Sequence, residues 1–323
     1  MTMPFAVSAS ASASDDLPLA VGPAISARGG FPDEAMFIAT LIAKERLARG
    51  DISAARDALG GARGEAWVEE GIACDLALDD GEAARAALEG LIPGVDVVVQ
   101  PRASRRKQLL VADMDSTMIA VECIDELADY AGIKAEVAAV TERAMRGELD
   151  FEAALDARVA LLKGLDARVI DHCHDQRVRL TSGAEALVQT MSANGAYCLL
   201  VSGGFSRFAD RVAAEIGFDA AIANELIVAD GRILGTVRKP VVAADGKRQA
   251  LLDAAAARQI PLDETLAIGD GANDIPMLKA AGLGVAYHAK PAVIAAADAR
   301  IEANDLTALL YAQGYARKDW AAD

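Results

Sequence analysis

The chain has 323 residues, of which 53% are hydrophobic, and its 32 basic and 48 acidic residues give a formal net charge of −16. Such an acidic balance argues against nucleic acids or anionic membranes as partners. No apolar run is long enough to cross a bilayer, and the scattered cysteines, without a C-x-x-C pair, are typical of reduced thiols. We therefore expect about two or three globular domains in the cytoplasm.

The first third of the chain changes character twice. Residues 1–30 are rich in Ala, Ser, Gly and Pro, and we expect a disordered leader. Residues 31–100 follow the order β-α-β(-β)-α-β, with predicted helices at Glu45–Leu59 and Glu82–Leu91, which is typical of a ferredoxin-like α+β domain. Residues 101–108 carry a run of basic side chains, which we interpret as a solvated linker.

A second pattern begins at residue 109. Leu109–Ala112 is a short apolar run typical of a buried parallel strand. Helical segments then fill residues 122–179 without a strand between them, and strands alternate with helices again over residues 180–323. This pattern predicts an α/β core, a doubly wound parallel (Rossmann-like) sheet built from residues 109–121 and 180–323, with a helical bundle inserted into it.

Three local patterns allow narrower predictions. Residues 182–185 (S-G-A-E) form a capping box that should begin a helix. Residues 222–229 and 233–237 flank Asp230-Gly231 and should form a hairpin. The H-x-H pattern at residues 172–174 is interpreted as a polar helix face rather than a zinc site, because no second cluster supplies the remaining ligands.

Polar groups follow three of the predicted strands. They are Asp113 and Asp115, then Ser202 with Gly203 and Gly204, then Asp270 with Asn273 and Asp274. Because neighbouring parallel strands end at the same edge, these groups can meet in one crevice. Aspartates at i and i+2 lie on the same side of an extended chain, and their repulsion calls for a cation between them. Their oxygen ligands favour Mg²⁺, with Asp270 as a further metal ligand and Asp274 as a supporting group.

The chemistry that fits this group is phosphoryl transfer. The reaction needs a nucleophile in line, a cation, and hydrogen-bond donors around the phosphate oxygens. Asp113 can attack as a carboxylate and form an aspartyl phosphate. Asp115 can protonate the leaving alkoxide and then deprotonate the hydrolytic water. The pKa of Asp115 is pulled in both directions, because nearby carboxylates raise it and a metal ion lowers it.

Other residues can hold the phosphate itself. The Ser202 hydroxyl and the Gly203 amide, which we expect at a helix start, can donate hydrogen bonds to phosphate oxygens. Lys247 can supply compact positive charge. Asn273 lies one helical turn beyond Asp270 and can support the same site. Each of these residues alone would be unremarkable as part of a turn or a helix surface, and their shared order after apolar strands points to one site.

These motifs carry a resemblance to a known family. D-M-D-S-T at 113–117, S-G-G at 202–204, Lys247 and G-D-G-A-N-D at 269–274 resemble the four motifs of the haloacid dehalogenase-like (HAD) hydrolases. Within that superfamily, residues 113–274 resemble the phosphoserine phosphatases. The finer resemblance is carried by D-M-D-S-T-M-I followed by Glu122, and by R-V-x-L-L-K-G beginning at Arg158.

The resemblance implies an Mg²⁺-dependent phosphatase that makes L-serine from O-phospho-L-serine, the last step of serine biosynthesis. It implies that residues 122–179 form a cap over the catalytic core. In that cap Glu122 would bind the substrate ammonium group and Arg158 its carboxylate, while Met145 and Phe151 close over them. Residues 31–100 are similar in pattern to ACT-like modules, for which we expect packing or homodimer formation ahead of amino-acid binding.

Two alternatives stay open. The same site could act on another small phosphomonoester such as phosphohomoserine, or transfer the phosphate to another acceptor. A receiver-type phospho-acceptor module also places aspartates and a lysine at strand ends. The inserted helices and the acid two residues after Asp113 favour an enzyme, since a receiver must protect its phosphate from fast hydrolysis.

Overall fold

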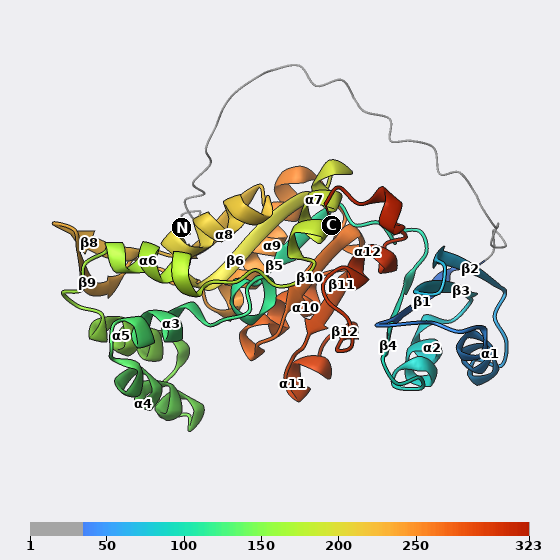
Figure 1. The fold of residues 1–323 in the computed structure, drawn as a ribbon, viewed down its shortest axis with the longest axis horizontal. Helices are drawn as coiled ribbons and strands as arrows, with labels where there is room; N and C mark the ends of the chain where they lie inside the picture. Colours follow the sequence, from blue (N-terminus) through green and yellow to red (C-terminus); the bar gives the residue numbers. More distant parts are fainter. Residues whose placement is uncertain (1–34, 323) are drawn as a thin grey trace, which may run out of the picture.

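The computed structural model describes residues 35–322, so the leader predicted for residues 1–30 lies outside the described residues. Figure 1 shows an N-terminal domain at one end, a central sheet with helices on both faces, and a group of helices with a short hairpin at the other end. None of the described helices has the length and apolar character that crossing a membrane requires.

The N-terminal domain is a four-stranded antiparallel sheet with the strand order β2-β3-β1-β4 and two helices. Its elements are β1 (Phe37–Ala43), α1 (Arg49–Ala58), β2 (Gly64–Glu69), β3 (Ala73–Leu78), α2 (Gly81–Leu88) and β4 (Val95–Pro101). Leu41, Leu76 and Leu88 belong to a hydrophobic core that the helices share with one face of this sheet. The order along the chain is therefore β-α-β-β-α-β.

Both helices of this domain are shorter than predicted. α1 begins at Arg49 rather than Glu45, because Ala48 has an extended backbone and Leu47 donates its N–H to the Gly71 carbonyl (2.7 Å). α2 ends at Leu88 rather than Leu91, because the cap residue Glu89 is already extended. The helical periodicity of the sequence extends past the residues at which the backbone leaves the helical conformation.

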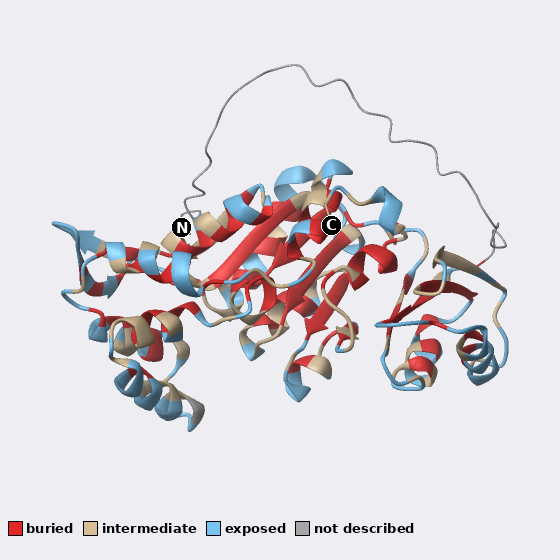
Figure 2. Cartoon of the chain, viewed as in Figure 1, coloured by how far each residue is buried: buried red, intermediate tan, exposed pale blue. Residues whose placement is uncertain are grey.

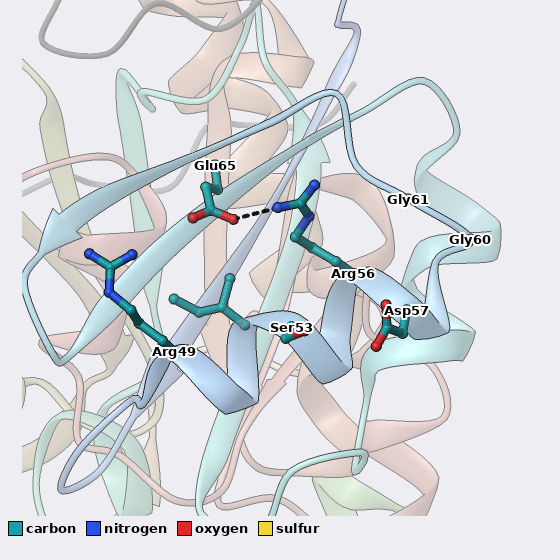
Figure 3. Close-up of a pocket in the computed structure, with 8 residues that line it drawn as sticks. Arg49, Ser53, Arg56, Asp57, Gly60, Gly61 and Glu65 are labelled. Atoms are coloured by element: carbon teal, nitrogen blue, oxygen red, sulfur yellow. Dashed lines mark hydrogen bonds and ion pairs between the residues drawn. The ribbon is translucent and has the colours of Figure 1, made fainter.

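The N-terminal domain has a cavity of about 540 Å³ between α1 and β2 (Figure 3). Arg49 and Arg56 of α1 line it together with Glu65 of β2, and Arg56 Nη1 lies 3.0 Å from Glu65 Oε2. Gly60 and Gly61 close one end. None of the site residues predicted from the sequence lies in this cavity.

The segment predicted to be a solvated linker is instead partly buried between the two domains. The Arg105 side chain is 15% exposed, and its Nη1 lies 2.7 Å from Asp75 Oδ2 of β3. Arg105 Nε also donates to the Ala312 carbonyl of the C-terminal domain (2.8 Å). Lys107 is 3% exposed and donates to the Asp263 carbonyl (2.8 Å). Buried charges need partners, and these basic residues find theirs in both domains.

The central sheet has six parallel strands in the order β12-β11-β10-β5-β6-β7. The strands are β5 (Leu109–Ala112), β6 (Tyr197–Phe205), β7 (Ala220–Asn224), β10 (Thr265–Gly269), β11 (Leu283–Tyr287) and β12 (Ala299–Ile301). β5 comes first in the chain and lies in the middle, with later strands added on both sides. The doubly wound parallel sheet predicted from the sequence is therefore confirmed. β12 was not predicted.

Helices cover both faces of this sheet. One face carries α7 (Ala184–Ala193), α8 (Ser206–Ile216) and α12 (Ala308–Ala312), and the other carries α9 (Ala244–Arg258), α10 (Ile275–Ala280) and α11 (Pro291–Ile294). Successive side chains of a strand point to opposite faces, so Leu110 and Ala112 pack into the first group and Leu109 and Val111 into the second. Figure 2 shows the strands as the buried centre of the molecule.

Two local predictions in the core need correction. The capping box at 182–185 does not form: Gly183 occupies the N-cap position with φ +79°, and the Ser182 hydroxyl donates to Asp305 Oδ2 (2.6 Å). The hairpin around Asp230-Gly231 is present as β8 (Leu226–Ala229) and β9 (Arg232–Val237), but the residues before it form β7 of the central sheet.

Four helices that come before α7 in the chain form a group beside the β8–β9 hairpin (Figure 1). They are α3 (Cys123–Tyr130), α4 (Lys134–Met145), α5 (Phe151–Leu161) and α6 (Arg168–Arg177). The H-x-H pattern lies in α6 and is not a polar face, because Cys173 is 0% and His174 is 4% exposed. His174 packs near Phe208 of α8, with 6.2 Å between ring centroids. Packing of α6 against α8 buries His174, which the sequence pattern alone does not indicate.

Candidate active site

Neighbouring strands of the central sheet bring the predicted motifs together. β5 pairs with β10 on one side and with β6 on the other, so the residues at their carboxyl ends lie along one edge. This edge and the inserted helices α3, α4 and α5 line a cavity of about 490 Å³. Predicted site residues that line it are Asp113, Asp115, Glu122, Phe151, Arg158, Gly203, Asp270 and Asn273. Residues from the core and the inserted helices therefore face one space.

The remaining predicted residues lie beside this cavity. Ser202, Lys247 and Asp274 are each 0% exposed. Lys247 and Asp274 make direct contacts with the cavity-lining residues, as described next. Met145 is the last residue of α4, and only its place in that helix is described.

Lys247 is the buried centre of the site. Its Nζ lies 2.6 Å from Asp113 Oδ1 and 2.7 Å from Asp274 Oδ1. Burial lowers the pKa of Lys247, but the two carboxylates outweigh burial and the net shift is upward. The ammonium therefore stays charged. Asp274 uses its other oxygen to accept the Gly271 N–H (3.0 Å), which fixes the loop after β10.

The two aspartates after β5 have different surroundings. Burial raises the pKa of Asp113 well above its ordinary value, with Lys247 opposing and Asp274 and Asp115 adding to the rise. Burial, together with the Glu122 carboxylate, raises the pKa of Asp115 to about 7, although Asp115 Oδ1 accepts the Cys123 N–H (3.2 Å). A carboxyl group with a pKa near neutrality can both donate and accept a proton, which suits a general acid and base.

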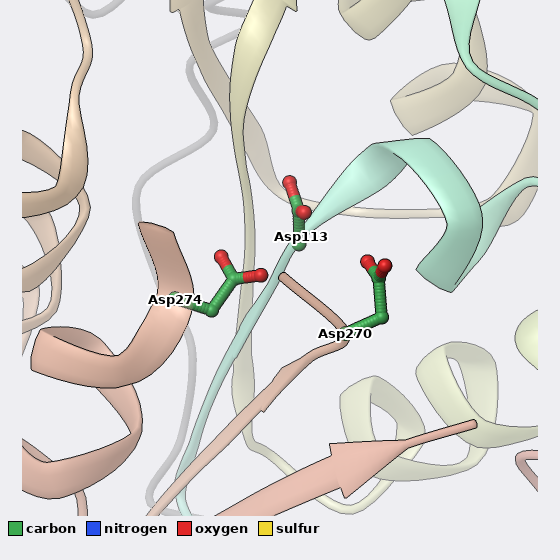
Figure 4. A group of neighbouring side chains, drawn as sticks. All are labelled: Asp113, Asp270 and Asp274. Atoms are coloured by element: carbon green, nitrogen blue, oxygen red, sulfur yellow. The ribbon is translucent and has the colours of Figure 1, made fainter. Parts of the chain in front are cut away.

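Three carboxylates form a group that fits a divalent cation (Figure 4). Carboxylate oxygens of Asp113, Asp270 and Asp274 lie within 4.8 Å of one another. Burial raises the pKa of Asp270 to about 6, with Asp274 and Glu122 adding to the rise. Among the residues that the structure describes, only Lys247 forms ion pairs with these carboxylates, so a hard cation with oxygen ligands fits.

Some carboxylate oxygens of this group already have hydrogen-bond or ion-pair partners. Both oxygens of Asp274 are engaged, one by Lys247 and the other by the Gly271 N–H. Asp270 accepts a hydrogen bond from the Thr117 hydroxyl (3.2 Å) and has no ion pair within the described chain. The Asp115 carboxylate lies outside this three-residue group. The predicted ligand set of Asp113, Asp115 and Asp270 stays a prediction.

We expect Mg²⁺ to stabilise the protein more at high pH than at low pH. Burial raises the folded-state pKa of Asp115 to about 7 and of Asp270 to about 6. The metal-free fold therefore loses stability as the pH rises from the unfolded values of about 4 through this range, and Mg²⁺ competes with the protons. The Tm gain from MgCl2 over NaCl of equal ionic strength should be larger at about pH 8 than at about pH 5.

Differential scanning fluorimetry measures this gain, and Asp270→Asn is the matched control because it preserves shape and removes one carboxylate charge. The variant should lose most of the Mg²⁺-dependent shift. Equal Tm gains at the two pH values, or a full gain in Asp270→Asn, would contradict a metal site built on these carboxylates.

The stretch predicted to bind phosphate differs from the expectation in its backbone. Residues 202–204 lie in the last part of strand β6, and α8 begins only at Ser206, so the Gly203 amide is not at a helix start. The Ser202 Oγ accepts the Gly204 N–H (2.8 Å). A Cβ at Gly204 would lie 3.1 Å from Asp115 Oδ2, so glycine lets this strand approach the acid closely.

A buried asparagine that the sequence did not single out holds this strand. Asn224 is 2% exposed, and its Nδ2 donates to the Gly203 carbonyl (2.8 Å). Its Oδ1 accepts the Val242 N–H (2.7 Å). Asn224 thus joins the end of β6 to the segment that leads into α9. A lone asparagine at the end of a strand carries no motif, so only the fold identifies it.

The inserted helices place two opposite charges on the far side of the cavity. Glu122 precedes α3, and its Oε1 accepts a hydrogen bond from the Ser116 hydroxyl (2.8 Å). Arg158 lies in α5, and its Nε donates to the Ala154 carbonyl (3.3 Å). Burial lowers the pKa of the Arg158 guanidinium, while carboxylates including that of Asp125 oppose the shift. One acid and one guanidinium thus line the same cavity as Asp113.

Several cavity residues were missed from the sequence. They include Asp125, Thr141, Leu155 and Lys290. Lys290 follows β11, so the rule that polar residues gather at the carboxyl ends of strands applies to it as well. Asp125, Thr141 and Leu155 lie on the inserted helices and have no sequence signal, because only the packing of those helices turns them toward the cavity.

Comparison with known proteins identifies the family of this chain. A family model described as haloacid dehalogenase-like hydrolase matches residues 110–279. The chain belongs to this family. The match covers the residues from Asp113 through the inserted helices to the loop with Asp270, so it includes every site residue predicted from the sequence but not Lys290.

Individual relatives of this HAD hydrolase are also similar. A phosphoserine phosphatase of Streptomyces coelicolor is 47% identical over 235 residues, which are 72% of this chain and 57% of that protein. The chain thus spans little more than half the length of that relative. One from Polaromonas is 47% identical over 208 residues, or 63% of this chain and 88% of that protein. A crystal structure of a probable phosphoserine phosphatase from Vibrio cholerae has a TM-score of 0.70 and 34% identity, covering 88% of each chain.

Proposed function

We propose that this HAD hydrolase is a phosphoserine phosphatase that uses Mg²⁺ and converts O-phospho-L-serine to L-serine and phosphate. The observation that carries the proposal is one cavity with Asp113 on its core side and the opposite charges of Glu122 and Arg158 on its cap side. A phosphoserine molecule needs the same three contacts, for phosphate, ammonium and carboxylate. The phosphoserine phosphatases among the relatives support this substrate.

In the first step the Asp113 carboxylate attacks phosphorus, and the bond from phosphorus to the serine oxygen breaks. Asp115 donates its proton to the leaving alkoxide, giving L-serine and an aspartyl phosphate on Asp113. Asp115 then takes a proton from water, whose oxygen attacks phosphorus; the bond from phosphorus to the Asp113 oxygen breaks, which releases phosphate and regenerates the Asp113 carboxylate. The pKa of about 7 at Asp115 allows both proton transfers.

Residues around Asp113 would hold the phosphoryl oxygens. Lys247 supplies fixed positive charge, and Ser202, the Gly203 amide and Asn273 can supply hydrogen-bond donors. Asp113 and Asp270 would hold Mg²⁺, with Asp115 as the third predicted ligand and Asp274 in support, and the ion would neutralise charge on the phosphate. Met145 and Phe151 would close over the bound substrate.

We expect Arg158→Ala to weaken binding of phosphoserine selectively. A guanidinium recognises a carboxylate through paired hydrogen bonds, and losing one partner of such a pair raises KM by about thirtyfold or more. An aryl phosphate without a carboxylate should show a much smaller change. Steady-state kinetics on both substrates measure the difference, with Arg168→Ala as the control because Arg168 is an exposed cap arginine outside the cavity. Equal effects on both substrates would refute carboxylate recognition by Arg158.

For the N-terminal domain we propose an ACT-like module whose main role is packing, with homodimer formation as a second role. The Arg105–Asp75 pair and the hydrogen bond from Arg105 to Ala312 support packing against the catalytic core. The element order predicted for residues 31–100 is also that of ACT-like modules.

We further propose that residues 122–179 act as the cap over the catalytic core.

The substrate is tested by phosphate release from a small panel with and without Mg²⁺. The panel contains O-phospho-L-serine, phosphothreonine, phosphohomoserine and an aryl phosphate, with Asp113→Asn as the blank. We expect a strong preference for phosphoserine that depends on Mg²⁺. Activity without preference would retain the HAD chemistry and reject the substrate. No release from any compound would reject the phosphatase.

A further inference from the structure

Glu122 has an unusual setting for an acid at the start of a helix. It occupies the N-cap position of α3, but its carboxylate accepts no hydrogen bond from a helix N–H. Instead its Oε1 accepts the hydroxyl hydrogen of Ser116 at 2.8 Å. No hydrogen bond of the described residues engages Oε2, and Glu122 lines the cavity. The carboxylate is thus held by one oxygen and presents the other.

Ser116 provides this hydrogen bond from a strained backbone. Its φ of +55° and ψ of +5° lie in the left-handed region, which glycine adopts easily and a residue with a Cβ does not. Both neighbours are tied to the site: Asp115 Oδ1 accepts the Cys123 N–H, and the Thr117 hydroxyl donates to Asp270. The Ser116 hydroxyl is therefore fixed relative to the catalytic aspartates. A functional role for this hydroxyl would explain why a residue other than glycine occupies the strained position.

The hydrogen bond from Ser116 to Glu122 matters because a positive charge, Arg158, lines the same cavity. Arg158 shares the cavity with Glu122, and the Glu122 carboxylate acts electrostatically on the guanidinium. A direct pair between them would occupy both groups that the substrate needs. Within the described chain no ion pair joins Glu122 and Arg158; Ser116 donates to Glu122, and Arg158 Nε donates to the Ala154 carbonyl (3.3 Å). The Ser116 hydroxyl thus gives Glu122 a partner other than Arg158.

We propose that Ser116 is a positioning residue that makes the site selective for phosphate esters carrying an amino group. Its hydroxyl fixes the Glu122 carboxylate so that Oε2 contacts the ammonium group of the substrate. Arg158 is then left free to bind the carboxylate of the substrate. The inference rests on the proposed function, because it specifies how Glu122 recognises the amine of phosphoserine.

The test compares O-phospho-L-serine with 3-phosphooxypropionate, which is the same molecule without its amino group. We expect Ser116→Ala to lower the ratio of kcat/KM for phosphoserine to kcat/KM for the deamino compound by about five- to tenfold, mainly through KM. Ser116→Gly should lower it equally, because it removes the hydroxyl and also relieves the left-handed backbone. Ser182→Ala is the matched control, since the Ser182 hydroxyl donates to Asp305 Oδ2 (2.6 Å) outside the cavity.

A double-mutant cycle with Glu122→Gln separates positioning from a general structural effect. In that background the further change Ser116→Ala should leave the ratio unchanged. A ratio in Ser116→Ala equal to that of the wild type, or equal losses on both substrates, would overturn the inference and leave the proposed function standing. A wild-type enzyme that does not prefer phosphoserine to the deamino compound would overturn the proposed function itself, and the role of Ser116 with it.

Discussion

Replacing Asp113 with asparagine should abolish phosphate release while leaving the protein folded. The change removes the attacking carboxylate and keeps an oxygen that can accept a hydrogen bond from Lys247, which lies 2.6 Å from Asp113 Oδ1. Loss of a catalytic nucleophile typically lowers kcat by at least about a thousandfold. Lys247 would still pair with Asp274 at 2.7 Å, and one buried negative charge would be gone. We therefore expect an unchanged or higher Tm.

Phosphate release and thermal unfolding of the same preparation measure both parts of this prediction. Mass spectrometry of the Asp113-containing peptide should accompany the assay, because deamidation of the asparagine would restore the wild-type residue. Turnover above a hundredth of the wild-type rate in a preparation free of deamidation would exclude Asp113 as the nucleophile.

Replacing Lys247 with methionine should damage both stability and activity. The ammonium is fully buried between Asp113 and Asp274, so its loss leaves two buried carboxylates facing each other. Breaking a buried ion pair on one side lowers the free energy of unfolding by about 3–5 kcal/mol. The pKa of Asp113, already raised by burial, should rise further, so the nucleophile becomes protonated. We expect kcat to fall at least about a hundredfold.

Urea unfolding in EDTA measures the stability of Lys247→Met without a contribution from metal ions. The double variant with Asp113→Asn should recover part of the lost stability, because only Asp274 then remains charged at the centre. Lys247→Arg keeps the charge and should be more stable than Lys247→Met, although its planar guanidinium fits a compact site poorly. A Lys247→Met protein as stable as the wild type would contradict a charged lysine at this position.

The strands and the motifs after them were predictable because they obey local rules. Leu109–Ala112 is apolar on both faces, as a strand covered by helices requires, and the doubly wound order follows from alternation of strands and helices. Asp113 and Asp270 meet because strands β5 and β10 are parallel neighbours. These outcomes depend on sequence patterns that are short and strong.

The errors concern contacts between segments distant in the chain. Arg105 and Lys107 look solvated in the sequence and are buried because carbonyls and a carboxylate from both domains surround them. His174 is buried because α8 packs against α6. Asn224 holds the Gly203 carbonyl from another strand. Ser116 lies within a recognised motif, yet only its backbone angle and its bond to Glu122 assign it a role.

An acid quench of the enzyme during turnover of O-phospho-L-serine labelled on phosphorus tests the proposed mechanism most directly. We expect labelled protein whose label lies on the Asp113 peptide, is labile to hydroxylamine, and disappears quickly when unlabelled phosphoserine is added. The Asp113→Asn protein should carry no label. Rapid phosphate release with no label on Asp113, or a label that persists through the chase as in a receiver module, would contradict this mechanism.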